Sequence, residues 1–166
     1  RTPLETVIPL DTPLVLFLDP SDACNFKCKF CPTSDRKLMK EVGRPWRTMK
    51  MDLYEKIVAD MKNFNRPIEV LRLYKDGEPL LNKKFPDMVK LAKQEGVCNR
   101  VDTTTNASLL TPEKGEKIIE AGLDRINISI EGVSNEQYKN FSDVNLEFSS
   151  ILENVKYFYS IRDGCD

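Results

Sequence analysis

The sequence has no histidine among its 166 residues. Without an imidazole, the chain cannot use His-based acid–base catalysis, a Cys–His nucleophile pair or a Cys2His2 zinc site. No apolar run is long enough to cross a bilayer, since the stretch at 14–18 has only the length of a strand. Neither charge sign dominates, because 25 basic residues face 26 acidic ones. The composition therefore gives no electrostatic reason to expect a nucleic acid partner.

A secretory signal and a starting methionine are also missing from the sequence, which opens at Arg1. The missing signal and the cysteines without obvious pairs suit a reducing compartment, so we expect a cytoplasmic location. Residues 1–13 hold three prolines without a period and predict an irregular lead-in. Residues 14–166 suffice for one domain with its own core.

Three of the five cysteines, Cys24, Cys28 and Cys31, lie on one short loop that follows the apolar run. The spacing C-x3-C-x2-C lets one loop place three sulfurs on one face of an iron–sulfur cube. An ordinary [4Fe–4S] site uses four thiolates, so one iron would stay open for a ligand that is not protein. The alternatives are a zinc site with a fourth ligand, a disulfide with a spare thiol, or a four-cysteine cluster completed by Cys98 or Cys165.

Four predicted strands, each followed by a helical pattern, indicate an α/β fold with a parallel sheet and right-handed crossovers. The predicted strands are 14–19, 68–74, 100–105 and 126–131. The first predicted helix begins at Asp52, the second spans 84–95, and the third runs from the cap at Thr111 to Gly122. A short helical turn follows Ser134, and the last helix covers 146–162.

Local signals refine these elements. Asp52 and Glu55 read as a capping box, and Leu53 belongs to the apolar stripe of that helix. The first strand is almost continuously apolar, as expected for a strand covered on both faces. The basic segment 36–50 could line the entry of an anionic substrate, but such a run is more often a solvated loop.

The fourth strand shows the clearest alternation. Three isoleucines of 126–130 alternate with Asn127, Ser129 and Glu131. We expect the isoleucines to pack beneath helices and the polar residues to face the interior of the fold. The edge of this strand would then lack a partner, which natural domains avoid.

Further motifs follow the predicted strands at the ends where α/β barrels place their chemistry. Asp76-Gly77-Glu78-Pro79 follows the second strand, and Thr105-Asn106-Ala107 follows the third. Ser129-Ile130-Glu131 ends the fourth. Together with the cysteine loop, these motifs resemble those of the radical S-adenosylmethionine (radical SAM) enzymes over residues 14–140.

The resemblance implies specific site residues. The three loop cysteines would bind a [4Fe–4S] cluster, and S-adenosylmethionine would cap the fourth iron. Asp76 departs from the family's GGEP motif, where it replaces the first glycine. The implied cofactor-binding residues are Phe30 beside the adenine, Gly77, Glu78 and Pro79 of the GGEP-like turn, Thr105 and Asn106, and Ser129. Cys98 lies at the start of a strand, away from this end, and we expect neither it nor Cys165 to be a ligand.

The implied fold is a partial (β/α)6 TIM-like barrel. The sequence supplies only four βα units, so we expect residues 14–166 to be the N-terminal part of a radical SAM core domain that is truncated at its C-terminus. The chain looks most like the branch that contains the molybdopterin-precursor cyclase and peptide-modifying enzymes with C-terminal auxiliary clusters.

The implied activity begins with an electron from a flavodoxin- or ferredoxin-like partner. Reductive cleavage of the bound cofactor would yield a 5′-deoxyadenosyl radical that takes hydrogen from a substrate. A peptide side chain is the first expectation for this substrate, and a nucleotide or sugar derivative is the second. No catalytic acid or base can be assigned. A non-catalytic iron–sulfur electron-transfer or scaffold domain remains the alternative, and a zinc-binding module is a third possibility.

Overall fold

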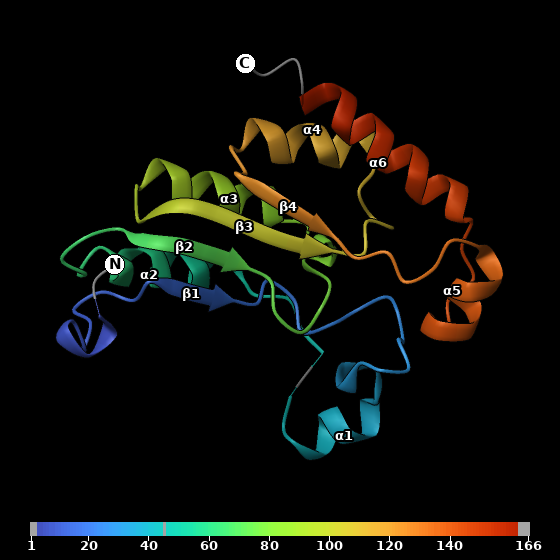
Figure 1. Ribbon diagram of the computed structural model, residues 1–166, viewed down its shortest axis with the longest axis horizontal. Helices are drawn as coiled ribbons and strands as arrows, with labels where there is room; N and C mark the ends of the chain where they lie inside the picture. Colours follow the sequence, from blue (N-terminus) through green and yellow to red (C-terminus); the bar gives the residue numbers. More distant parts are fainter. Residues whose placement is uncertain (1–2, 45, 163–166) are drawn as a thin grey trace.

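Four parallel strands form one sheet in the computed structural model, which describes residues 3–44 and 46–162. The strands lie side by side in chain order (Figure 1). They are β1 (Val15–Leu18), β2 (Ile68–Leu73), β3 (Cys98–Thr105) and β4 (Arg125–Ile128). The predicted α/β class and parallel sheet are confirmed.

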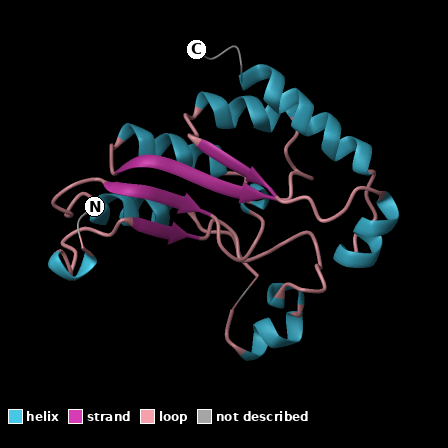
Figure 2. Ribbon diagram, in the orientation of Figure 1, coloured by secondary structure: helices cyan, strands magenta, loops and turns pink. Residues whose placement is uncertain are grey.

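The helices of the described residues are α1 (Arg36–Glu41), α2 (Met51–Met61), α3 (Phe85–Gln94), α4 (Pro112–Glu120), α5 (Asn135–Ser142) and α6 (Phe148–Arg162), with 3₁₀ turns η1 (Leu4–Thr6), η2 (Pro32–Ser34) and η3 (Pro79–Leu81). Helices α2, α3 and α4 cover one face of the sheet, and α6 packs on α4 (Figure 2). In the described part of the chain, no helix is long and apolar enough to cross a membrane.

The hydrophobic core lies between the sheet and these helices. Leu71 and Val101 are Cα partners in the parallel register and both are fully buried, as is Phe85 of α3. Burying such a side chain stabilises the fold by roughly 1.5–3 kcal/mol. This core fixes the sheet and thereby the strand ends from which the site is built.

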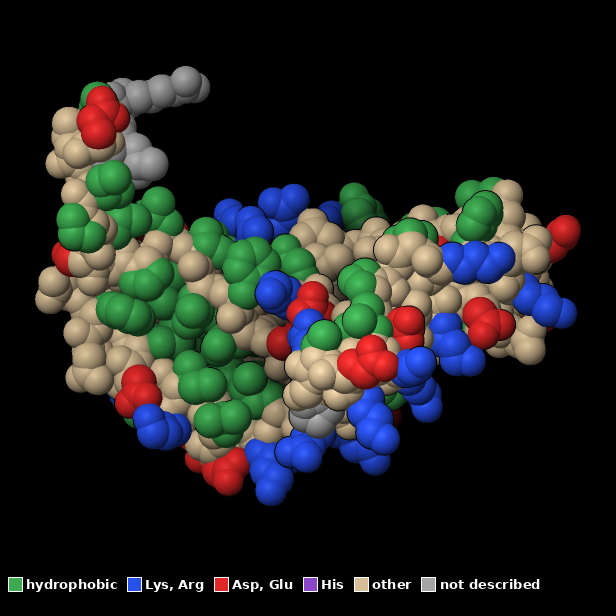
Figure 3. All heavy atoms as spheres, turned by 90° about the horizontal axis from the view of Figure 1, so that it is seen from below, with side chains coloured by type: hydrophobic (Ala, Val, Ile, Leu, Met, Phe, Trp, Pro, Cys, Tyr) green, Lys and Arg blue, Asp and Glu red, His purple; other side chains and the backbone are tan. Residues whose placement is uncertain are grey.

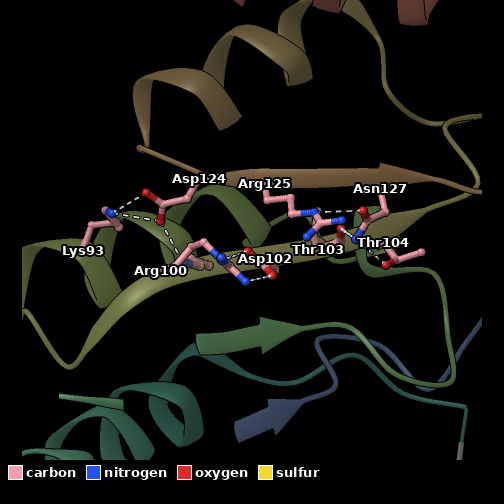
Figure 4. A network of polar contacts seen from close by, with 9 residues as sticks. Lys93, Arg100, Asp102, Thr103, Thr104, Asp124, Arg125 and Asn127 are labelled. Atoms are coloured by element: carbon pink, nitrogen blue, oxygen red, sulfur yellow. Dashed lines mark hydrogen bonds and ion pairs between the residues drawn. The ribbon is translucent and has the colours of Figure 1, made fainter. Parts of the chain in front are cut away.

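The opposite face of the sheet is polar toward β3 and β4. Asp102 of β3, which is 2% exposed, accepts two hydrogen bonds from the Arg100 guanidinium at 2.8 and 3.1 Å (Figure 4). Arg125 donates to the Oδ1 atom of Asn127 at 3.2 Å. Thr104 and Asn127 are register partners and therefore share this face. The predicted inward direction of Asn127 is confirmed.

The isoleucines of β4 follow the prediction only within the strand. Ile126 and Ile128 pack against the core, but Ile130 is 45% exposed. The strand ends at Ile128, so the alternation no longer directs the side chain that lies two residues later. The prediction for Ile130 is wrong for this reason.

The first strand is less covered than its sequence predicts. Val15 and Phe17 are 39% and 43% exposed, whereas Leu16 packs against the core. β1 is an edge strand, and no helix of the described residues lies over its second face (Figure 1). The prediction that both faces are covered is therefore wrong. Hydrophobic side chains also gather on the surface seen from below (Figure 3).

Helix α2 begins one residue before the predicted start. Lys50 is its N-cap, and the carboxylate of Asp52 accepts a hydrogen bond from the backbone of Leu53, so the predicted capping box does not form. Leu53 is 50% exposed, and Tyr54 takes its place in the core with no exposed surface. Val58 and Met61 are buried as well, so the apolar stripe of α2 starts at Tyr54 instead of Leu53.

The basic segment 36–50 contains a helix, α1, which the sequence prediction missed. Asp35 caps this helix because its carboxylate accepts hydrogen bonds from the amides of Lys37 and Leu38 in the first turn. The Arg36 guanidinium stacks on the Trp46 ring at 4.1 Å and, with Arg47, borders a hollow of about 640 Å³. The segment is therefore folded rather than a plain solvated loop.

The loop after β2 packs tightly against the loop after β1. A Cβ atom on Gly77 would lie 1.8 Å from the carbonyl oxygen of Ser21 and 2.6 Å from that of Ala23. The next amide, that of Glu78, donates to Ala23 at 2.8 Å. Only glycine allows this approach, and the contact places the GGEP-like turn beside the cysteine loop.

Tyr54 gives a stability prediction because its hydroxyl is buried without a hydrogen-bond partner. Burial also raises the pKa of this phenol. An unsatisfied buried donor costs about 1–3 kcal/mol, so Tyr54→Phe should raise the free energy of unfolding by about 1 kcal/mol in urea denaturation. Tyr157→Phe is the control, since this hydroxyl donates to Glu116 at the surface. A clear loss of stability in Tyr54→Phe would contradict the prediction.

Gly77→Ala should destabilise the fold by about 3 kcal/mol, because the new methyl group meets backbone that cannot move independently. Gly43→Ala is the matched control. Gly43 has φ +71° and open space around it, so only a backbone cost of about 1 kcal/mol applies there. The measurement is denaturant unfolding of both variants. Equal effects would show that the contact between the two loops does not matter.

Candidate functional site

The predicted site residues meet in one cavity of about 160 Å³ at the C-terminal ends of the strands. Those that line it are Cys24, Cys28, Phe30, Cys31, Gly77, Glu78, Thr105, Asn106 and Ser129. Pro79 does not line the cavity, because it is buried at the start of η3. Tyr74, Lys75 and Thr104 also border it. The sequence prediction missed Tyr74 and Lys75, although their place at the end of a strand could have indicated them.

The cysteine loop is held against the end of α5. The amides of Lys27 and Lys29 donate to the carbonyl oxygens of Ser142 and Phe141, both at 2.9 Å. Phe26, which is 3% exposed, packs edge-on against Tyr138 of α5 at 5.9 Å between ring centroids. The loop thus has a fixed support before any ligand is considered.

The three thiols of this loop are free and half-buried. Burial raises the pKa of Cys24 to about 11 and also raises the pKa of Cys28. The thiolates that bind iron would therefore need compensating positive charge, which iron itself supplies.

The donor set fits an iron–sulfur cluster. In the described residues, no group of three or more His, Cys, Asp or Glu side chains is arranged around a single ion. A cube does not need such convergence, because each cysteine binds a different iron. Cys24, Cys28 and Cys31 could hold the cluster from one side and leave the remaining iron facing the cavity.

Glu78 is bonded within the protein. Its Oε1 atom accepts hydrogen bonds from the Leu80 amide at 2.9 Å and the Thr105 hydroxyl at 2.6 Å, and its Oε2 atom accepts one from the Asn106 amide at 2.9 Å. The side chain is 2% exposed. Burial raises the pKa of Glu78 despite these three donors. The side chains of Glu78 and Thr105 therefore shape the cavity by binding each other.

Asn106 connects the third strand end to the cysteine loop. Its Nδ2 atom donates to Oδ1 of Asn25 at 3.0 Å, and its Oδ1 atom accepts from the Ser108 hydroxyl at 2.7 Å. Asn25 in turn donates to Ser108 at 2.8 Å. Ala107, between them, has φ 59°, a left-handed conformation that favours glycine. Asn25 and Ser108 carry no sequence signal for this role, because they are 83 residues apart.

Of the other residues that the sequence analysis considered, Ser129 and Phe30 line the cavity and Cys98 does not. Ser129 follows the end of β4, and its amide donates to the Thr105 carbonyl at 2.9 Å. Phe30 is 68% exposed at the cavity, so simple core packing does not account for it. Cys98 starts β3 and lies seven residues from Thr105, about 23 Å along the strand. Cys165 lies outside the described residues.

Asp76, which departs from the GGEP pattern, pairs with a cation. Its Oδ2 atom lies 2.5 Å from the Nη1 atom of Arg44. Arg44 also lies 3.7 Å from Asp22 and 3.9 Å from Asp19. Burial raises the pKa of Asp19. A carboxylate at this position therefore finds a partner and does not enter the cavity.

Known proteins resemble the chain in sequence. A family model described as the Radical SAM superfamily matches residues 18–163. A probable GTP 3′,8-cyclase of Methanococcus maripaludis is 35% identical over 117 residues, which cover 70% of this chain and 36% of that protein. The GTP 3′,8-cyclase of Staphylococcus haemolyticus is 26% identical over 152 residues, or 85% of this chain and 41% of that protein. The chain thus spans about two-fifths of the length of these curated relatives.

A solved structure of anSMEcpe with bound AdoMet has a TM-score of 0.69 at 19% identity, and the match covers 89% of this chain and 41% of that chain. At this identity the likeness shows the fold, which agrees with a partial TIM-like barrel. The family match extends over most of the chain and includes the cysteine loop and all the motifs that line the cavity. Its cofactors, a [4Fe–4S] cluster and S-adenosylmethionine, are those expected from the motifs. The chain therefore belongs to the radical SAM superfamily and to its class of enzymes.

Proposed function

We propose that this chain forms part of a catalytic domain that binds one [4Fe–4S] cluster and S-adenosylmethionine in the cavity at the strand ends. When bound, these two groups would supply the radical chemistry of the family, which is the reductive cleavage of S-adenosylmethionine that leads to removal of hydrogen from a substrate. One observation carries the proposal: the cysteine loop and the ends of β2, β3 and β4 all border the same cavity.

The residues of the chain would divide the task. Cys24, Cys28 and Cys31 hold the cluster. The backbone at Gly77 packs closely on the backbone of Ser21, and Ser129 lines the same cavity as Gly77, so both would contact the cofactor's aminoacyl part. The exposed ring of Phe30 offers a surface for the adenine and shields the site from water. Pro79 fixes the turn that follows, and the side chains of Glu78, Thr105 and Asn106 hold the wall.

We propose that the substrate is a peptide side chain or a nucleotide or sugar derivative. The relatives in sequence are GTP 3′,8-cyclases by name, which favours the nucleotide. A structure of anSMEcpe contains AdoMet and a peptide, but its 19% identity supports only the fold. The electron would come from a flavodoxin- or ferredoxin-like protein. We also propose that a further strand meets the edge of β4, because no strand of the described residues pairs with it.

The cluster assignment predicts that each of Cys24→Ala, Cys28→Ala and Cys31→Ala loses the cluster. After anaerobic reconstitution, the unchanged protein should hold about four irons per chain, and each variant should hold far fewer. Cys98→Ala is the matched control, because its thiol is buried at the opposite end of β3. If this control loses iron as fully as Cys28→Ala, the three-ligand assignment is wrong.

The cofactor assignment predicts that S-adenosylmethionine changes the electron paramagnetic resonance spectrum of the reduced, cluster-loaded protein. The reason is that a new ligand alters the open iron. Ser129→Ala should weaken this response, raising the cofactor concentration needed for half of the change by about tenfold, the loss of roughly 1.4 kcal/mol of binding free energy. Ser160→Ala, on the surface of α6, is the control. A spectrum that stays unchanged at saturating cofactor would favour the electron-transfer alternative.

A further inference from the structure

Two buried hydroxyl groups contact the sulfurs of the cysteine loop. The Oγ atom of Ser142 lies 3.3 Å from Sγ of Cys28, and the Oγ1 atom of Thr33 lies 2.9 Å from Sγ of Cys31. Ser142 has no exposed surface and Thr33 is 4% exposed. They come from separate elements, since Ser142 ends α5 and Thr33 lies in η2. Two of the three sulfurs thus have a hydroxyl neighbour that is shielded from solvent.

The direction of these hydrogen bonds depends on whether the sulfur carries a proton. As a thiol, Cys28 donates to Ser142. A sulfur bound to iron has no proton, so the hydroxyl must then be the donor. Thr33 also donates to the carbonyl of Asp76 at 3.2 Å, which is longer than its contact with Cys31. A negatively charged sulfur is the stronger acceptor, so the proton of Thr33 would turn toward it.

Hydrogen bonds to ligand sulfurs influence the reduction potential of an iron–sulfur cluster. Reduction adds one negative charge, part of which resides on the sulfurs. A hydroxyl that points its proton at a sulfur therefore stabilises the reduced state more than the oxidised state. The effect is strong in a buried site, where water does not screen it.

We propose that Thr33 and Ser142 are positioning residues that raise the reduction potential of the cluster by donating hydrogen bonds to the sulfurs of Cys31 and Cys28. With a protonated Cys31, the Thr33 hydroxyl instead donates to the Asp76 carbonyl of the GGEP-like turn. The inference rests on the proposed function, since it requires that the loop hold a cluster.

The test measures the midpoint potential of the reconstituted protein by a spectroscopic redox titration, with iron counted per chain in every sample. Thr33→Val keeps the shape of the side chain but removes its hydroxyl, and Ser142→Ala does the same for α5. Thr33→Ser restores a hydroxyl. Ser34→Ala is the matched control, because Ser34 donates to the Cys31 carbonyl at 2.7 Å and contacts no sulfur.

We expect Thr33→Val and Ser142→Ala each to shift the reduction equilibrium about tenfold toward the oxidised cluster, which lowers the potential by about 59 mV for one electron. Thr33→Ser and Ser34→Ala should stay close to the unchanged protein. Fully loaded variants whose potentials equal that of Ser34→Ala would overturn the inference and leave the proposed function intact. An unchanged protein that takes up no cluster would instead overturn the proposed function.

Variants that fail to hold iron need a second measurement. If Thr33→Val loses its cluster, Ser142→Ala decides. If both lose it, the unchanged protein is compared in H2O and D2O by electron–nuclear double resonance of the reduced cluster. A coupling to exchangeable protons that persists in Thr33→Ser, which keeps the hydroxyl, would support the inference, and the absence of any such coupling in the unchanged protein would overturn it.

Discussion

The buried carboxylate of Glu78 holds together the segments from which the site is built. Removing a carboxylate from water costs several kcal/mol, and the three donors from Leu80, Thr105 and Asn106 offset that cost only in one arrangement. The turn after β2 and the end of β3 are therefore fixed relative to each other. Asn106 extends the connection to Asn25 in the cysteine loop. One charged side chain, kept from solvent, thus determines the position of three loops that are distant in sequence.

A second constraint acts where the loop after β1 meets the loop after β2. Gly77 packs against backbone at Ser21, and Arg44 lies between the carboxylates of Asp76 and Asp22. The replacement of a family glycine by Asp76 introduces a negative charge near the site, and the guanidinium compensates for it. The basic segment 36–50 therefore has a structural task beside the turn that follows β2, in addition to the surface hollow that it borders.

Much of the fold and the residues that meet at the site followed from the sequence, because strand periodicity, helix caps and motifs at strand ends are local signals. The approach of Gly77, Glu78 and Ser129 to the cysteines also followed, since parallel strands end at the same edge. Features that depend on contacts between residues far apart in sequence did not follow from it. The exposure of Phe17 depends on what covers an edge strand, and the contact between Asn25 and Ser108 joins residues 83 positions apart. Helix α1 was missed because its charged sequence lacks an apolar stripe.

The support of the cysteine loop by α5 has a consequence for the order of assembly. Lys27 and Cys28 find their partners 116 and 114 residues later, at Asp143 and Ser142. Contacts of such sequence separation form late in folding, because a long loop must close first. During synthesis, the cysteines leave the ribosome long before the helix that holds them. The nascent chain therefore carries three accessible thiols until residues 135–142 have been made, and iron delivery to an ordered loop would have to wait for this helix.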